Sequence, residues 1–326
     1  MNFLSTFKKS VLILSVCLVS SISVSHANDF PDRPITLLIP YPPGGSADIL
    51  ARPIAAQMQK DLGQSVILDY KPGAGGTIAS SQLTRSKPDG YTVLMVLAAH
   101  AINPSLYQNL PYNTTEDFVP VTHLASLPLI VAASKKAKFD DIAGLIEYAK
   151  KNPGGVTYAS AGNGNTSHLA VELFAIATDT SLLHIPYSGS GPAVVAMLSG
   201  EVDLMFDSIS TSVVHVKDKK LKGLAVSSVN RAAITPELPT LDETGVEGFD
   251  VSGWYGVVAP KGTPDSVIRS LNKAFTDAAH NPDITKQLND YGYEIVASSP
   301  ESFGNLINEE IAKWKVAVDN SGAKIQ

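Results

Sequence analysis

The feature of this sequence that most constrains its fold is an alternation of short apolar runs with longer amphipathic stretches. Residues 35–40, 65–69 and 91–97 are predicted to be buried strands, since each is a short apolar run bounded by turn-forming or charged residues. Residues 47–62 and 77–85, which lie between them, are predicted to be helices. This order indicates a parallel sheet with helices on its faces.

The same pattern starts again beyond residue 140. The predicted elements there are helices at 141–151, 166–177 and 192–198, and strands at 156–160, 183–185, 202–206 and 224–227. Two such units in one chain predict two α/β domains.

Two longer apolar runs, 119–133 and 254–259, are interpreted as strands that cross between the two domains. The amphipathic stretches that follow are predicted to return to the first domain, with Phe303 and Trp314 in its core. The expected fold class is therefore α/β with two domains. The first domain is expected at 28–128 and 251–326, and the second at 129–250.

The composition is that of a globular protein and excludes several classes of function. The chain has 326 residues, of which 44% are hydrophobic and 17% charged, so it has enough apolar material for a large core. Its formal net charge of −6 gives no broad basic surface for a phosphate backbone, so nucleic-acid binding is not expected. The single cysteine, Cys17, excludes an intrachain disulfide or a multi-cysteine metal site. Neither a metal nor a cofactor is expected.

The N-terminus has the pattern of a secretory signal peptide. Lys8 and Lys9 precede an apolar run at 11–24, which ends in a Ser-His-Ala sequence at Ala27. A membrane anchor is the alternative, but the run is shorter than the roughly 20 apolar residues that span a bilayer. We expect cleavage after Ala27, which removes Cys17, and export of a soluble protein to a bacterial periplasm.

Four glycine-rich loops each end a predicted strand and open a predicted helix. They lie at residues 42–46, 72–77, 161–166 and 188–192, and are called the first to fourth glycine loops. Glycine lets the backbone approach a ligand closely, and a helix N-terminus offers unpaired N–H groups and a partial positive charge. Ordinary strand-to-helix turns are the alternative for any single loop. Together the four loops predict a site for a small carboxylate at the carboxyl ends of the strands.

The side chains that could carry chemistry are few. The histidines are scattered without the spacing of a zinc site, and His168 either contacts a ligand or has a capping or core role. Tyr41, beside the first loop, and Asp207, after the strand at 202–206, are candidates for ligand contact. A hydrolase would need Ser160 or Ser190 with His168, but the spacing gives no nucleophile–base–orienter set, so an enzyme is not expected.

Several segments, taken in order along the chain, resemble one known family. They are PYPPGGSAD at 40–48, KPGAGG at 71–76, HAINPSLY at 100–107, YASAGNG at 158–164, GEVDLMFD at 200–207, LPT at 238–240 and APKGTP at 259–264. As a set they resemble the Bug, or tripartite tricarboxylate transporter (TctC-like), family of periplasmic solute-binding receptors. The resemblance covers essentially the whole chain after residue 27.

The resemblance implies a two-lobed periplasmic binding protein fold of type II, in which each lobe is a mainly parallel sheet flanked by helices. It implies that main-chain groups and ordered waters at residues 44–47 and 161–166 hold a ligand carboxylate in a cleft between the lobes. Ala98, Ser188 and Asp207 are the candidates for reading the far end of the ligand. Many family members have lysine where this chain has Ser188, so preference for a second carboxylate is open. The expected ligand-binding residues are Tyr41, Gly44, Gly45, Ser46, Ala47, Gly76, Ala98, Ser160, Gly162, Gly164, Asn165, Thr166, His168, Ser188 and Asp207.

The resemblance also implies a role without catalysis. The expected function is delivery of a small organic acid by a monomeric receptor to the membrane permease subunits of a tripartite tricarboxylate transporter. A sensor that presents its ligand to a signalling receptor is the alternative, since the same fold serves both roles. Gly45→Val and Gly164→Val are expected to abolish binding and leave the fold intact, because a side chain would fill the carboxylate position.

Overall fold

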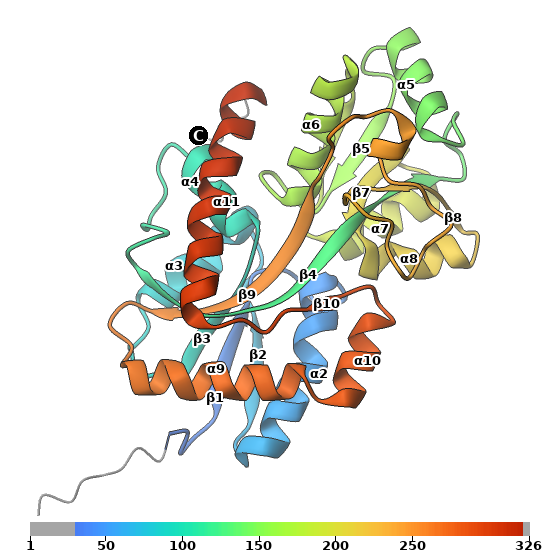
Figure 1. Cartoon of the computed structure of the whole chain (residues 1–326). Coiled ribbons are helices and arrows are strands. Elements are labelled where there is room, and N and C mark those ends of the chain that lie inside the picture. The colour runs from blue at the N-terminus through green and yellow to red at the C-terminus, as the bar shows by residue number, and fades with distance from the viewer. Residues whose placement is uncertain (1–29, 322–326) are drawn as a thin grey trace, which may run out of the picture. The chain divides into compact units, whose positions relative to one another are not determined.

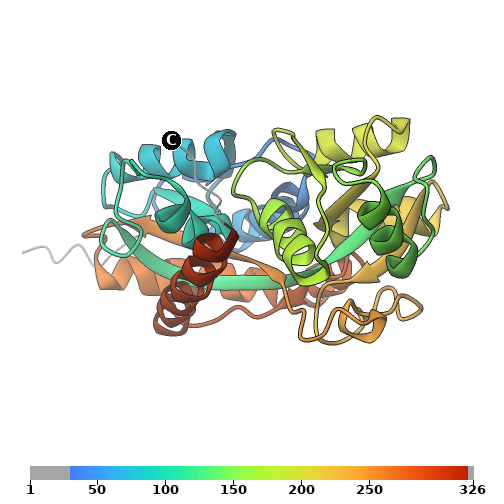
Figure 2. The same ribbon diagram turned by 90° about the horizontal axis from the view of Figure 1, so that it is seen from above.

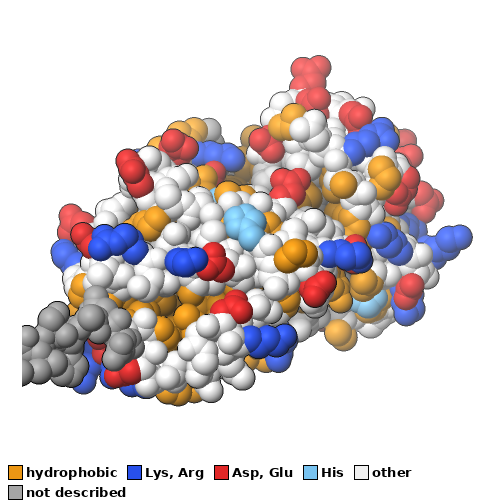
Figure 3. Space-filling view, turned by 60° about the horizontal axis from the view of Figure 1, so that its bottom comes forward, with side chains coloured by type: hydrophobic (Ala, Val, Ile, Leu, Met, Phe, Trp, Pro, Cys, Tyr) orange, Lys and Arg blue, Asp and Glu red, His pale blue; other side chains and the backbone are white. Residues whose placement is uncertain are grey.

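The computed structural model of the chain describes residues 30–321, and from Arg33 onward these form one compact unit. The predicted signal peptide lies outside the described residues. No helix within 30–321 is long and apolar enough to cross a membrane. On the face shown in Figure 3, acidic and basic side chains are interspersed rather than gathered by sign.

The first group of strands is parallel, as predicted. The order across the sheet is β2–β1–β3, and both neighbouring pairs run parallel. Helix α4 was not expected from the sequence, because Pro104 interrupts its pattern. The elements are β1 (Ile35–Ile39), α2 (Ser46–Leu62), β2 (Val66–Tyr70), the short 3₁₀ turn Ala74–Gly76, α3 (Thr77–Thr84), β3 (Thr92–Leu97) and α4 (Ala99–Leu106).

The second group repeats this arrangement. Strands β7, β5 and β6 are neighbours in that order and run parallel. Helix α8 was also not expected from the sequence. The elements are α5 (Ile142–Lys151), β5 (Thr157–Ser160), α6 (Thr166–Thr178), β6 (Leu183–Pro186), α7 (Ser190–Ser199), β7 (Leu204–Ser208), α8 (Ile209–Lys217), β8 (Leu221–Val226) and the 3₁₀ turn Asp242–Thr244.

Two long strands, β4 (Phe118–Ser134) and β9 (Ser252–Pro260), join the two groups, as Figures 1 and 2 show. β4 pairs antiparallel with β9 as far as Pro128, and from Leu129 onward it pairs antiparallel with β7 and β8. β9 also pairs antiparallel with β3. The described strands therefore form one mixed sheet. Its parallel pairs lie in the outer groups, and its antiparallel pairs lie around the crossing strands.

The C-terminal elements return to the first group of strands. They are α9 (Asp265–Ala279), α10 (Pro282–Asn289), β10 (Glu294–Ile295) and α11 (Pro300–Ser321). α9 packs against α2, and α11 packs against α4 and β4 (Figure 1). Phe303 and Trp314 are fully buried, which confirms their predicted place in the core.

One carboxylate fastens α11 to the sheet. Glu310 Oε2 accepts hydrogen bonds from the indole N–H of Trp314 at 2.8 Å and of Trp254 at 3.0 Å. Trp314 belongs to α11 and Trp254 to β9, so the carboxylate joins two elements far apart in sequence.

Candidate ligand-binding site

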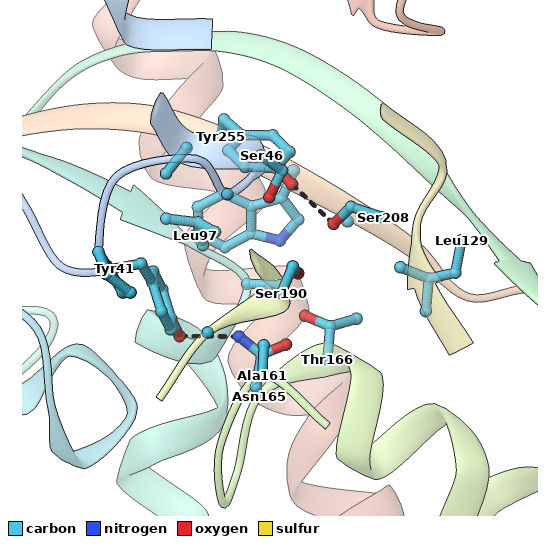
Figure 4. A pocket seen from close by; sticks show the side chains of 17 residues that line it. Tyr41, Ser46, Leu97, Leu129, Ala161, Asn165, Thr166, Ser190, Ser208 and Tyr255 are labelled. Atoms are coloured by element: carbon cyan, nitrogen blue, oxygen red, sulfur yellow. Dashed lines mark hydrogen bonds between the residues drawn. The ribbon is translucent and has the colours of Figure 1, made fainter. Parts of the chain in front are cut away.

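A cavity lies at the carboxyl ends of β1, β3, β5 and β7, where the crossing strands also pass. We call it the inner cavity (Figure 4). No lysine, arginine, histidine, aspartate or glutamate is among its lining residues. These are Tyr41, Pro42, Gly45, Ser46, Ala47, Leu97, Ala98, Leu129, Ala161, Asn165, Thr166, Gly189, Ser190, Ser208, Gly253, Trp254 and Tyr255.

Five helices begin at this cavity. Their N-cap residues, all among the lining residues, are Gly45 of α2, Ala98 of α4, Asn165 of α6, Gly189 of α7 and Ser208 of α8. The first N–H groups of a helix have no acceptor within that helix, and the helix dipole places partial positive charge there. The cavity is therefore electropositive without a cationic side chain, which suits it to an anion.

Tyr41 and Asn165 meet across the inner cavity. Asn165 Nδ2 donates to Tyr41 Oη at 2.8 Å (Figure 4). Asn165 Oδ1 accepts from the N–H of Ser167 at 3.0 Å. Burial raises the pKa of Tyr41 well above the usual tyrosine value, so its hydroxyl keeps its proton. Because Tyr41 Oη accepts from Asn165, its own proton can be donated to a ligand.

The remaining wall is largely apolar. Leu97, Leu129 and Trp254 line it, and Tyr255 Oη lies 3.2 Å from Ser208 Oγ. Burial raises the pKa of Tyr255 to about 12, so this hydroxyl also remains a donor. Such a cavity combines hydrogen-bond donors with apolar surface that suits a short carbon chain.

An acidic side chain, Asp48, holds the first glycine loop in place. Asp48 is buried and accepts from the N–H of Gly44 at 2.8 Å and from the hydroxyl of Tyr70. Gly44 donates to Oδ2, and Arg52 Nε lies 2.8 Å from Oδ1, the oxygen that also accepts from Tyr70. Burial acts to raise the pKa of Asp48, but the bonds from Arg52, Tyr70 and Gly44 outweigh it and lower the pKa.

The structure brings about half of the expected binding residues to the inner cavity. They are Tyr41, Gly45, Ser46, Ala47, Ala98, Asn165 and Thr166. Gly162 and Ser188 line a second hollow, the outer groove, which shares Tyr41 and Ala161 with the inner cavity and is also lined by Tyr107 and Tyr187. Gly76 lines a third hollow beside Tyr41, with His100 and Asn103.

Five expected binding residues line none of these three hollows: Gly44, Ser160, Gly164, His168 and Asp207. Asp207 is fully buried and accepts hydrogen bonds from the hydroxyls of Thr211 and Ser212. Burial raises its pKa, although those hydrogen bonds act in the opposite direction.

Sequence reasoning missed several lining residues. Gly189 and Ser190 belong to the fourth glycine loop, where the sequence selected only Ser188. Trp254 and Tyr255 lie in the strand interpreted as a crossing, which gave no sign of which side chains face a ligand. Leu129 marks the point where β4 changes partners, and that is visible only in the strand pairing. Within residues 30–321, no three histidine, cysteine, aspartate or glutamate side chains are grouped to hold a metal.

The fold and the inner cavity define the class of solute-binding proteins. Residues 50–323 match the profile of the tripartite tricarboxylate transporter family receptor, TctC. The chain is 36% identical over 302 residues to Protein BugT of Bordetella pertussis, covering 92% of this chain and 93% of BugT.

Solved structures give the same result. The chain matches the periplasmic binding protein BugD with a TM-score of 0.88 and 34% identity, over 91% of this chain and 100% of that one. It matches an R. palustris protein solved with adipate with a TM-score of 0.87 and 33% identity, over 90% and 98% of the two chains. It matches MatC from Rhodopseudomonas palustris with bound malate with a TM-score of 0.85 and 32% identity, over 89% of this chain and 100% of that one.

This chain belongs to the TctC/Bug family of periplasmic solute-binding receptors. Membership confirms the expected family, the α/β periplasmic binding protein fold and a receptor role rather than an enzymatic one.

Proposed function

We propose that the protein binds one small organic carboxylate in the inner cavity and delivers it to the membrane permease subunits of a tripartite tricarboxylate transporter. The observation that carries the proposal is the meeting of five helix N-termini at a cavity with no charged side chain. The family description supports the transporter partner, and the relatives solved with adipate and malate support a carboxylate ligand.

In this proposal one ligand carboxylate lies against the N-termini of α2, α6 and α7, where Tyr41 donates to it. Ser46 and Ala47 supply main-chain N–H groups from α2, and Thr166 supplies one from α6. The carbon chain lies along Leu97, Leu129 and Trp254. The outer groove with Ser188 takes the far end of a longer ligand.

The two lobes proposed here are residues 28–128 with 251–326, and residues 129–250. Support comes from β4, which exchanges β9 for β7 and β8 between Pro128 and Leu129, and from β9, which begins at Ser252. The receptor acts as a monomer in the periplasm after cleavage at Ala27. Light scattering on the exported protein tests the monomeric state, and the mass of the exported protein tests cleavage after Ala27.

Calorimetric titration tests the binding proposal. The protein is first unfolded and then refolded, so that it carries no ligand from the cell. Aliphatic mono- and dicarboxylates should bind, whereas amides of the same chain length should not. A ligand at 100 times its Kd should stabilise the fold by about 2.7 kcal/mol. If no carboxylate in the panel gives heat or a thermal shift, the proposal fails.

Tyr41→Phe tests the placement of the carboxylate. Losing a hydrogen bond to a charged group costs about 1.5–3 kcal/mol, so the Kd should rise by at least about tenfold. Tyr148→Phe, on α5 and away from the cavity lining, is the matched control and should bind like the unaltered protein. Equal affinity in the two variants would place the carboxylate elsewhere.

A further inference from the structure

The third glycine loop is fastened by side chains that do not line the inner cavity. The N–H of Gly164 donates to His168 Nδ1 at 3.2 Å. The N–H of Gly162 donates to Ser160 Oγ, also at 3.2 Å, and Ser160 Oγ lies 2.6 Å from His184 Nε2. Two glycine N–H groups of one loop thus depend on two imidazoles, one directly and one through a serine.

The hydrogen bonds favour one tautomer of each ring. A donor N–H at Gly164 requires an unprotonated Nδ1, so the proton of His168 is on Nε2. Ser160 is fully buried and accepts from Gly162, and its hydroxyl proton is satisfied when it is donated to an unprotonated His184 Nε2. Burial lowers the pKa of each histidine to about 4, and for His184 the proximity of His168 adds to this, so both rings are neutral near pH 7.

The two rings also hold each other in place. They are stacked at 4.1 Å between centroids with 11° between their planes, and Tyr158 stacks on His184 at 4.8 Å. The charged group facing His168 is Glu172, whose Oε1 lies 3.9 Å from Nε2 and also accepts from the Tyr158 hydroxyl. The acceptor at His168 therefore has little freedom to leave the loop.

The first glycine loop has the same geometry with different chemistry. There Gly44 donates to Asp48, again four residues later in the first turn of the helix, and Arg52 balances the carboxylate. The third loop uses a neutral imidazole at the corresponding place, so its acceptor adds no negative charge beside a bound anion.

We propose that His168, supported by His184 and Ser160, is a positioning residue for ligand binding that holds the third glycine loop by accepting from Gly164 without touching the ligand. This role rests on the proposed function, because the ends of that loop, Ala161, Asn165 and Thr166, line the inner cavity. It differs from the direct contact that the sequence predicts for Ser160 and His168.

Two substitutions separate the acceptor from the bulk of the side chain. In His168→Asn the amide oxygen occupies the place of Nδ1 and can still accept from Gly164, whereas His168→Gln carries its amide one bond further out. The Kd for the best carboxylate of the panel should stay within about threefold in His168→Asn. It should rise by about tenfold in His168→Gln, because the loop loses a hydrogen bond that orders it. His280→Gln, exposed at the end of α9, is the matched control and should leave the Kd unchanged.

Amide hydrogen exchange of the ligand-free protein gives a readout that needs no ligand. Protection at residues 161–166 should persist in His168→Asn and fall in His168→Gln, while β5 and α6 beyond the first turn stay protected. Equal affinity and equal protection in the two variants overturn the proposal, and so does equal loss in both, since the acceptor is then not what matters. If the unaltered protein binds no carboxylate but the exchange pattern follows the acceptor, the proposed function fails while the loop assignment stands.

Discussion

At the scale of single residues, the glycines of the loops differ in what surrounds them. Gly45 has φ −88°, and a Cβ built there meets only Pro42 O at 3.7 Å, so the backbone accepts a side chain that projects into open space. Gly164 has φ +73°, and a Cβ there would lie 2.0 Å from Leu106 Cδ2. A substitution at Gly45 therefore tests the cavity without disturbing the packing around it, whereas one at Gly164 does not.

Gly45→Ala should therefore weaken carboxylate binding by at least tenfold with little change in melting temperature, and Gly45→Val should weaken it further. The added carbons occupy space beside the N–H groups of Ser46 and Ala47. Calorimetric titration and thermal melting check the two parts. Gly304→Ala, in α11 and away from the cavity lining, is the control and should bind normally. Normal binding by both Gly45 variants would contradict the assignment.

The expectation that Gly164→Val leaves the fold intact does not agree with the contacts of this residue. A side chain there must displace Leu106 of α4 and adopt a left-handed backbone conformation, so lost binding would not separate a blocked site from disturbed packing. The sequence could not reveal this, because Leu106 and Gly164 are far apart in the chain.

At the scale of elements, α11 supports the cavity through one carboxylate. Glu310→Ala leaves two buried indole N–H groups unpaired, and each costs about 1–3 kcal/mol. The free energy of unfolding should fall by about 2–6 kcal/mol, and ligand affinity should also fall, because Trp254 lines the cavity. Urea unfolding followed by tryptophan fluorescence measures the first effect, and the chain has just two tryptophans, both bound to Glu310.

Lys313→Ala is the control for Glu310. The lysine amine lies 3.5 Å from the other oxygen of Glu310, but it is half exposed, so its loss should cost no more than about 1 kcal/mol. If Glu310→Ala is no more destabilising than Lys313→Ala, the bridge between the two indoles contributes little.

The elements show how far the sequence could lead. Glycine-rich loops between apolar runs and amphipathic stretches located the starts of α2, α3, α6 and α7, because that punctuation is local chemistry. α4 was not predicted, because Pro104 interrupts the helical pattern of its sequence. The bond between Asn165 and Tyr41, and that between Ser160 and His184, depend on how distant segments meet, so no local pattern carries them.

At the scale of the whole molecule, buried histidines make stability depend on pH. Burial lowers the pKa of His100, His168 and His184 from 6.5 to about 4. Between about pH 4 and pH 6.5 the unfolded chain binds more protons than the folded protein. The contribution of these histidines to the free energy of unfolding is therefore fully present above about pH 6.5 and is lost as the pH falls. Burial raises the pKa of Asp207, so its contribution to the free energy of unfolding is lost as the pH rises.

Comparison of the unaltered protein with His100→Leu isolates one of these groups, because every other titration is common to both. His100 is 3% exposed, and neither ring nitrogen has a hydrogen-bond partner among residues 30–321, so burial is what favours its neutral form. From pH 7.5 to 5.5 the unaltered protein should lose about 1 kcal/mol more stability than the variant, whatever their starting values. Urea unfolding in sulfonic-acid buffers, which add no carboxylate for the cavity to bind, measures the two slopes. Equal slopes would show that His100 titrates in the folded protein as it does in the unfolded chain.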